Sequence, residues 1–172
     1  MISHENIKRV YQRVQSPTAG DCMRCAVATL LQLDYEEVPD FVNRAWHETL
    51  KSFMKDHGYD YDYDVLWNPN VGYLEQPTAW CFTKDVERDP NDFFPRIRPD
   101  YGVDGLFIAT VYSPKYTDPN EHPLSHLHAV LCDVDFNIIH DPNPEYKGIV
   151  SYPYSQLIGY NGIRSIDIVR KI

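Results

Sequence analysis

The sequence lacks long hydrophobic runs, basic clusters and a cysteine-rich pattern. No uninterrupted apolar segment approaches the ~18 residues that a membrane-spanning helix needs. The polar start, residues 1–6, lacks the apolar region of a secretory signal peptide. Four cysteines in 172 residues are too few for a disulfide framework. We therefore expect a cytoplasmic protein without membrane association, whose cysteines are thiols.

Lysine and arginine never occur in a run longer than two residues, and the formal net charge at pH 7 is −9. A protein that follows the phosphates of a nucleic acid needs a basic patch or stripe, so the composition argues against nucleic acid as a partner. A glycine-rich phosphate loop, an internal repeat and a low-complexity segment are also lacking. The remaining signals are individual side chains and their spacing.

The composition is that of a folded protein. Hydrophobic residues make up 43% of the chain and aromatic residues 13%. A length of 172 residues suits one domain with a substantial core and is short for two. We therefore expect a single domain over residues 1–172.

Two helices are predicted in the first third of the chain. Apolar residues over 22–33 recur at the i, i+3, i+4 spacing of a helix buried on one face, and Asp21 is placed to cap it. A proline interrupts this pattern, and Asp40 is placed to cap a second helix over 41–57. Gly58 is expected to end that helix.

Residues 59–67 begin with alternating tyrosines and aspartates. A period of two predicts a half-buried strand whose aspartates face water at a sheet edge, where charge discourages unwanted pairing. The alternative is an acidic wall that receives a basic ligand. Residues 68–99 are rich in proline and predict an irregular connection, or a loop over a site.

The second half of the chain changes to strand patterns. Short apolar runs, bounded by turn residues, predict strands over residues 106–112, 127–132, 138–142, 149–152 and 165–170. Helices followed by such strands indicate an α+β fold. In it, the N-terminal helix that carries the cysteine packs on a C-terminal antiparallel sheet.

Cys22 is the candidate nucleophile. It follows Asp21 at the start of the first predicted helix. Unpaired backbone N–H groups and the positive end of the helix dipole converge there, and both favour the thiolate over the thiol. A lone cysteine is more often a small buried apolar residue, so a base and an orienting carboxylate are needed as well.

His128 and Asp141 lie on the two strands of a predicted hairpin. With a turn near Asp135, the numbers of residues paired across the strands sum to about 270, which places Asp141 beside His128. A carboxylate there would accept from one imidazole nitrogen and leave the other for a nucleophile. A register slip of one residue would bring His140 into that place instead.

The order of these residues is similar to that of a known family. Gln15 is followed by a Gly-Asp-Cys helix opening, a His-Ala-Val-Leu segment and a His-Asp-Pro ending. This order resembles papain-like cysteine peptidases, in particular the bacteriocin-processing (double-glycine leader) peptidase-like proteins of bacteria and phages. The resemblance implies a papain-like fold, with Cys22 as nucleophile, His128 as general base and Asp141 as the orienting carboxylate.

The same resemblance implies that Gln15 and the Cys22 backbone N–H form the oxyanion hole. The reaction would be hydrolysis or acyl transfer at an amide, peptide or isopeptide bond. The substrate would be a peptide or protein, and neither a cofactor nor a metal would be required.

Other functions use the same residues. Cys22 and Cys25 form a C-x-x-C pair at a helix start, which is also the pattern of a dithiol redox site. Together with His126 and His128, these cysteines have the donor types of a zinc site, although His-x-His is tighter than the usual spacing of a structural site. A third alternative is a papain-like binding module without turnover.

Overall fold

The computed structural model describes residues 4–16, 20–41, 46–65, 102–112, 127–133, 137–147, 152–153 and 163–172. Its helices are η1 (His4–Asn6), α1 (Cys22–Leu31), η2 (Tyr35–Glu37), α2 (Trp46–Asp56) and η5 (Pro144–Tyr146), where η marks a 3₁₀-helix. Its strands are β1 (Tyr59–Val65), β2 (Leu106–Tyr112), β3 (Leu127–Asp133), β4 (Asn137–His140), β5 (Tyr152–Pro153) and β6 (Ile163–Lys171). The predictions for residues 68–99, and for most of the strand 149–152, lie outside the described residues.

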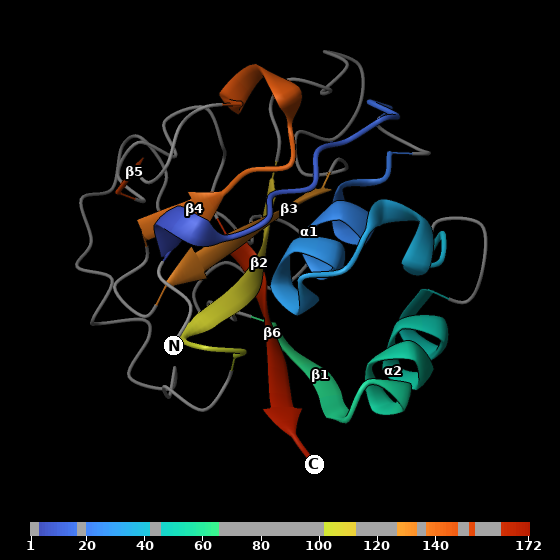
Figure 1. Ribbon diagram of the computed structural model, residues 1–172. Coiled ribbons are helices and arrows are strands. Elements are labelled where there is room, and N and C mark those ends of the chain that lie inside the picture. Colours follow the sequence, from blue (N-terminus) through green and yellow to red (C-terminus); the bar gives the residue numbers. More distant parts are fainter. Residues whose placement is uncertain are drawn as a thin grey trace, which may run out of the picture.

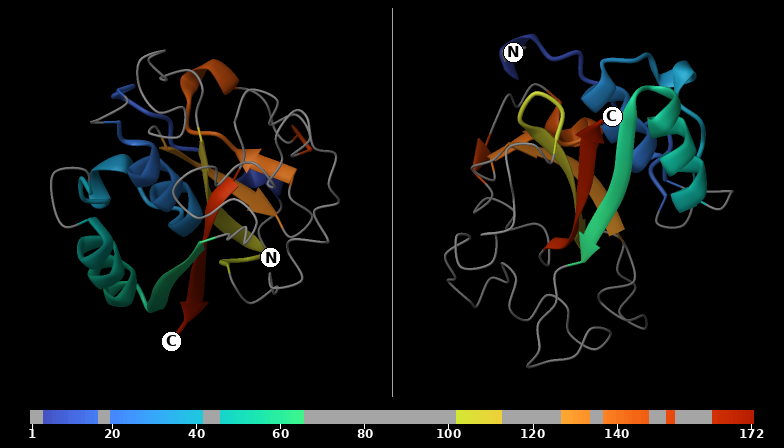
Figure 2. Two further views of the ribbon diagram at one scale, coloured as in Figure 1. Left: turned by 180° about the vertical axis from the view of Figure 1, so that it is seen from behind. Right: turned by 90° about the horizontal axis from the view of Figure 1, so that it is seen from below.

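Six strands of the described chain form one antiparallel sheet in the order β1-β6-β2-β3-β4-β5. Helices α1 and α2 lie on the same side of this sheet (Figures 1 and 2). α1 packs on β2 and β3, and α2 packs on β1. The fold is therefore α+β, with the helix that carries Cys22 packed on an antiparallel sheet, as the sequence predicts.

Helix α1 is buried more fully than a one-faced pattern predicts. Every residue from Cys25 to Leu30 is buried. The sheet covers one side of the helix, and the N-terminal segment described below covers another. The helix ends at Leu31, two residues before its predicted end, because Gln32 adopts the left-handed conformation with a φ of 58°.

The second helix is shorter than predicted. α2 begins at Trp46, whereas the sequence pattern places its start at residue 41. Phe41 is buried in the core but lies before the helix, so its apolar character reflects packing and not helical periodicity. Gly58 has a φ of +85°, a conformation that favours glycine, and follows the helix end as predicted.

Strand β1 confirms the predicted edge strand. It is the end strand of the sheet. Tyr61 is buried, whereas Asp60 and Asp62 on either side of it are exposed. The alternation of the sequence thus matches the alternation of buried and exposed side chains along the strand.

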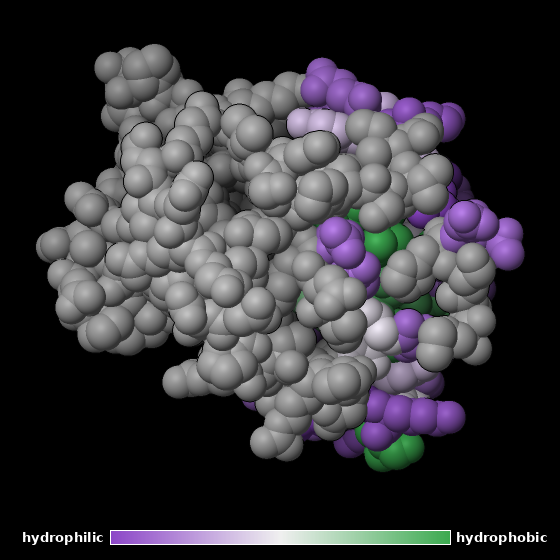
Figure 3. Space-filling view, turned by 90° about the vertical axis from the view of Figure 1, so that its left-hand side faces the viewer, coloured by the Kyte–Doolittle hydropathy of each residue, from purple (hydrophilic) through white to green (hydrophobic). Residues whose placement is uncertain are grey.

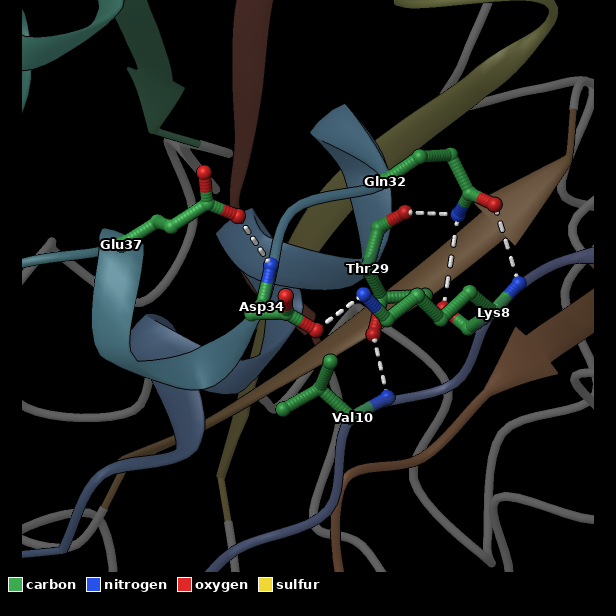
Figure 4. Close-up of polar contacts among 6 residues, drawn as sticks. All are labelled: Lys8, Val10, Thr29, Gln32, Asp34 and Glu37. Carbon is green, nitrogen blue, oxygen red and sulfur yellow. Dashed lines mark hydrogen bonds and ion pairs between the residues drawn. The ribbon is translucent and has the colours of Figure 1, made fainter.

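Residues 7–14, here called the N-terminal strap, run along α1 (Figure 4). The Lys8 N–H donates to Gln32 Oε1, and the Val10 N–H donates to Thr29 Oγ1, each over 2.9 Å. Two backbone donors that have no partner in a helix or strand are thereby satisfied by one side chain of α1 and by one that directly follows the helix. These hydrogen bonds fix the strap along the helix.

The strap also contacts the end of β4. His140 Nε2 lies 2.8 Å from Val10 O, and the Gln12 N–H donates to Pro142 O over 2.9 Å. Burial lowers the pKa of His140 to about 4, so the ring is neutral and donates through Nε2–H. The strap therefore ties α1 to the segment that follows β4.

Asp167 is a carboxyl group buried in the sheet. It lies on β6, is 1% exposed and accepts a hydrogen bond of 2.8 Å from the Tyr61 hydroxyl. Burial raises the pKa of Asp167 to about 7, and the hydrogen bond from Tyr61 opposes this rise only in part. The folded protein therefore retains a proton at Asp167 up to near-neutral pH, whereas an unfolded chain releases it near pH ~4.

We expect Asp167→Asn to remove part of the pH dependence of stability. Because the folded pKa is raised, the contribution of Asp167 to stability is present below pH ~4 and is lost as the pH rises through about 7. An amide keeps an acceptor for Tyr61 and does not ionise. The variant should therefore gain stability relative to the native protein between about pH 5 and about pH 8, as measured by urea unfolding.

Asp56→Asn is the matched control, because this carboxylate is exposed at the end of α2. The same chemical change there should leave the pH dependence unaltered. A native protein and an Asp167→Asn variant that respond equally to pH would show that Asp167 ionises normally in the fold.

The described surface is mainly polar. On the face in Figure 3, hydrophilic residues prevail among those described, and hydrophobic residues occupy small areas. Within the described ranges, the exposed large apolar side chains are Val14, Trp46, Leu127 and Ile172. No helix in this part of the chain is long and apolar enough to cross a membrane.

Candidate active site

Cys22 is the first residue of α1, as predicted. The N–H groups of Cys22 and Met23 lie in the first turn and so have no acceptor within the helix. The chain turns tightly just before this point, because a Cβ on Gly20 would lie 2.6 Å from Ser16 O. Only glycine permits so close an approach. The turn leaves the thiol at the positive end of the helix dipole.

Asp21 occupies the N-cap position, but its side chain does not cap the helix, contrary to the prediction. Its carboxylate accepts from the N–H groups of Arg13 and Val14, over 3.1 and 3.3 Å, and from the Tyr35 hydroxyl over 2.7 Å. These donors approach from outside the helix and draw the carboxylate away from it. Asp21 thereby fixes the end of the strap, which directly precedes Gln15, beside the start of α1.

Two guanidinium groups lie against the Tyr35 ring. The Cζ atoms of Arg13 and Arg24 are 3.9 and 3.8 Å from the ring centroid. Arg24 Nε also donates to Tyr35 O over 3.1 Å, and Arg13 pairs with Glu36 over 2.6 Å. Each cation–π contact contributes about 0.5–1 kcal/mol at an exposed site. Together these contacts hold η2 against the strap and α1.

His128 and Asp141 form a buried hydrogen-bonded pair, so the contact predicted from the hairpin is present. His128 Nε2 lies 2.7 Å from Asp141 Oδ1, and the two residues are 5% and 4% exposed. The same carboxylate oxygen accepts from the Asn143 N–H over 2.9 Å. The contact with Nε2 leaves Nδ1 as the second nitrogen of the imidazole.

The register behind this contact differs in part from the prediction. Cys132 pairs with Ile138 as predicted, but Leu131 pairs with His140, so the register shifts by one residue between the two pairs. A bulge of this kind adds a residue to one strand and bends it. β4 ends at His140, and Asp141 reaches the imidazole from the segment after the strand instead of across the ladder.

The His128 side chain and the backbone of Ala129 and Met23 lie beside the Cys22 thiol and favour its thiolate form. Burial by itself would raise the pKa of this thiol. The proximity and charge of His128, together with the two backbone contacts, outweigh burial and lower the pKa of Cys22. Because Nε2 contacts Asp141, Nδ1 is the ring nitrogen that remains for the thiol.

The imidazole shifts in the opposite direction. Burial by itself would lower the pKa of His128, but the hydrogen bonds and charges of Asp141 and Cys22 outweigh it and raise the pKa to about 10. A thiol with a lowered pKa beside an imidazole with a raised pKa favours a thiolate–imidazolium ion pair near neutral pH.

Two residues that the sequence analysis names as candidates, His140 and Gln15, do not join the group formed by Cys22, His128 and Asp141. His140 points to the strap, where it donates to Val10 O. Gln15 is exposed at the end of the segment 4–16, and among the contacts between described residues none joins it to Cys22. The role of Gln15 as an oxyanion donor stays a prediction.

Cys25 and Cys132 differ from Cys22 in their surroundings. Both are free thiols buried in the core, and burial raises the pKa of each well above its usual range. Cys25, the second thiol of the C-x-x-C pair, is therefore poorly placed for thiol–disulfide exchange with a molecule in solution. For the zinc alternative, no three His, Cys, Asp or Glu side chains in the described ranges form a group suited to a metal ion, and His126 lies outside those ranges.

The strap and the Asp21–Tyr35 contact were not predicted. Tyr35 stands next to two glutamates, which is the pattern of a solvated surface, and the strap has no clear helix or strand period. The one local signal is an aspartate directly before Cys22, and helix capping alone also accounts for an aspartate at that position.

The chain matches no protein-family model, and no similar curated protein or solved structure is found.

Proposed function

We propose that this protein is a cysteine-nucleophile hydrolase or acyltransferase with a papain-like arrangement, acting on an amide, peptide or isopeptide bond. Cys22 is the nucleophile, His128 the general base and Asp141 the residue that orients the base. The observation that supports this most directly is the position of His128 between Asp141 and Cys22, with opposite pKa shifts of thiol and imidazole. Such opposed shifts are typical of acid–base pairs in active sites.

The first step forms a thioester. His128 Nδ1 holds the proton of Cys22, and the thiolate attacks the carbonyl carbon of the substrate while the carbonyl π electrons move to oxygen. The Cys22 N–H at the helix start and the Gln15 amide are the proposed donors to this oxyanion. Each donor of this kind typically contributes about 2.7–4 kcal/mol of transition-state stabilisation. The C–N bond then breaks, and the imidazolium protonates the leaving amine.

The second step resolves the thioester. Neutral His128 takes a proton from water or from an acceptor amine as that group attacks the acyl carbon. The C–S bond breaks, and Cys22 leaves as a thiolate. Asp141 holds the ring through Nε2 during both steps. Water gives hydrolysis and an amine gives acyl transfer, so one set of side chains serves both reactions.

The N-terminal strap supports both halves of the proposed site. Its end is held at the nucleophile by Asp21, and its middle is held at the His-Asp half by His140 and Pro142. Catalysis requires that nucleophile and base keep a fixed separation, because small misplacements cost large factors in rate. The strap meets this requirement by linking α1 to the end of β4.

We expect the native protein to cleave or ligate a subset of a mixed peptide library, and the Cys22→Ala variant to do neither. New termini and ligated products are identified by mass spectrometry, with a primary amine added to a parallel sample to detect acyl transfer. Removal of the nucleophile eliminates the covalent route, so product formation should fall by at least about 1,000-fold.

Cys25→Ala is the control, because it removes a thiol one turn away on the same helix and should retain the activity. Products that form equally with native protein and Cys22→Ala would contradict the proposal. A native protein that binds peptides but yields no product would favour the binding module.

A further inference from the structure

A pocket of about 460 Å³ opens at the surface where α2, β1 and β6 meet. It is here called the basic pocket, and its lining is formed by Lys51, Lys55, Asp60, Arg170, Lys171 and Ile172. All six residues are exposed. The pocket therefore presents charged side chains to any solute that enters it.

The basic pocket concentrates positive charge in an acidic protein. Four of the chain's 16 lysine and arginine residues line it, with one acidic side chain, Asp60, among them, while the net charge of the protein is −9. Lys51 and Lys55 lie one turn apart on α2, where like charges repel and destabilise a helix slightly. Solubility does not require such clustering, since an acidic protein already repels its copies. A negatively charged ligand would be attracted to all four cations and would offset the repulsion among them.

The helix dipole accounts for only one of the four cations. Lys55 lies in the last turn of α2, where a cation is favourable. Lys51 lies a turn earlier, and Arg170 and Lys171 belong to β6. Within the described part of the chain, Lys51, Lys55 and Lys171 form no ion pair with a carboxylate. Their charge is therefore available to a ligand.

The basic pocket is separate from the proposed active site. Val111 pairs with His128 on one side and with Ile163 on the other, so the start of β6 lies level with the imidazole. Arg170 lies near the other end of β6, about 23 Å further at ~3.3 Å per residue. Figure 1 shows β6 running from the centre of the sheet to the C-terminus, near α2. A ligand in the pocket does not contact Cys22.

We propose that the basic pocket binds a small polyanion that carries several phosphate groups. Its volume of about 460 Å³ lies within the range of small-molecule sites. The three lysines supply point charges for phosphate oxygens, and Arg170 adds a fourth positive charge to the lining. The cations converge on a pocket and do not follow a stripe along the surface, which favours a compact anion over an extended acidic protein segment.

Isothermal titration of the full chain with tripolyphosphate tests this proposal, and we expect one saturable site. The double variant Lys51→Gln, Lys55→Gln should bind tripolyphosphate at least about tenfold more weakly, because it loses two charged donors. The matched control is Lys8→Gln, Lys147→Gln, which removes the same charge away from the pocket. This control should change the affinity by less than about twofold at ~0.15 M salt, where distant charges are screened.

Weaker binding in the pocket variant alone supports the proposal. No saturable binding, or equal weakening in both double variants, overturns it, because equal weakening means that the anion responds only to net charge. A tetraglutamate peptide that binds as tightly as tripolyphosphate also overturns it and assigns the pocket to an acidic protein segment. None of these outcomes depends on the proposed reaction at Cys22.

Discussion

Replacing His128 with alanine should slow alkylation of Cys22 by iodoacetamide at pH ~6 by roughly tenfold or more. In the native protein the His128 contact lowers the pKa of the Cys22 thiol. A thiol with the usual pKa of ~8.5 is thiolate only to about 0.3% at pH ~6, roughly 300-fold less than a fully ionised thiol. The rate falls by less than this factor because a more basic thiolate is intrinsically more nucleophilic.

The pH profile of the alkylation rate is the sharper measurement, because it gives the apparent pKa of Cys22. That value should lie well below ~8.5 in the native protein and rise to ~8.5 or above in His128→Ala, where burial persists without the partner. Cys25 and Cys132 serve as internal controls, since both are buried. His57→Ala, which removes an exposed imidazole, controls for loss of a histidine. A Cys22 that is inert, or that reacts equally in both proteins, would contradict the ion pair.

Asp141→Ala should cause the largest loss of stability among substitutions at the site, about 3–5 kcal/mol in the free energy of unfolding. The change leaves His128 Nε2–H and the Asn143 N–H without their shared acceptor in a buried place. Unpaired buried donors and an unpaired imidazolium are both costly. Urea unfolding near pH ~7 measures the loss, and the Cys22 alkylation profile should shift to higher pH in the same variant.

Asp141→Asn separates charge from hydrogen bonding. The amide oxygen still accepts from both donors, so most of the stability should return. The negative charge that raises the pKa of His128 is gone, so the pKa of the imidazole should fall and that of Cys22 should rise. Equal alkylation profiles for native protein and Asp141→Asn would show that the carboxylate charge does not act on the pair.

The elements that position the site were predictable where local signals determine them. The start of α1 at Cys22 follows from a Gly-Asp opening before an apolar helix period, and the alternation over β1 follows from a period of two. The hairpin that carries His128 also follows from strand and turn signals. Each of these depends on residues close together in the sequence.

The remaining features depend on contacts between distant segments. The Asp21 side chain could cap its own helix or bind the strap. It binds the strap because Arg13, Val14 and Tyr35 supply hydrogen-bond donors to it. The local sequence pattern does not reveal these donors. The bulge between β3 and β4 lacks a glycine that would mark it. The apolar pattern places the start of α2 too early, because Phe41 is apolar for packing in the core and lies outside the helix. Tertiary contacts therefore decide what sequence periodicity leaves open.

The N-terminal strap also bears on the order in which the protein is synthesised. Its contacts with β4, Val10 with His140 and Arg9 with Ile139, join residues 130 positions apart. A ribosome that adds about 5–20 residues per second needs roughly 6–26 s to make that length of chain. His128 follows Cys22 by 106 residues, so for most of this interval the Cys22 thiol has no imidazole beside it. The proposed nucleophile therefore gains its base only after the strands that carry its partners have been made.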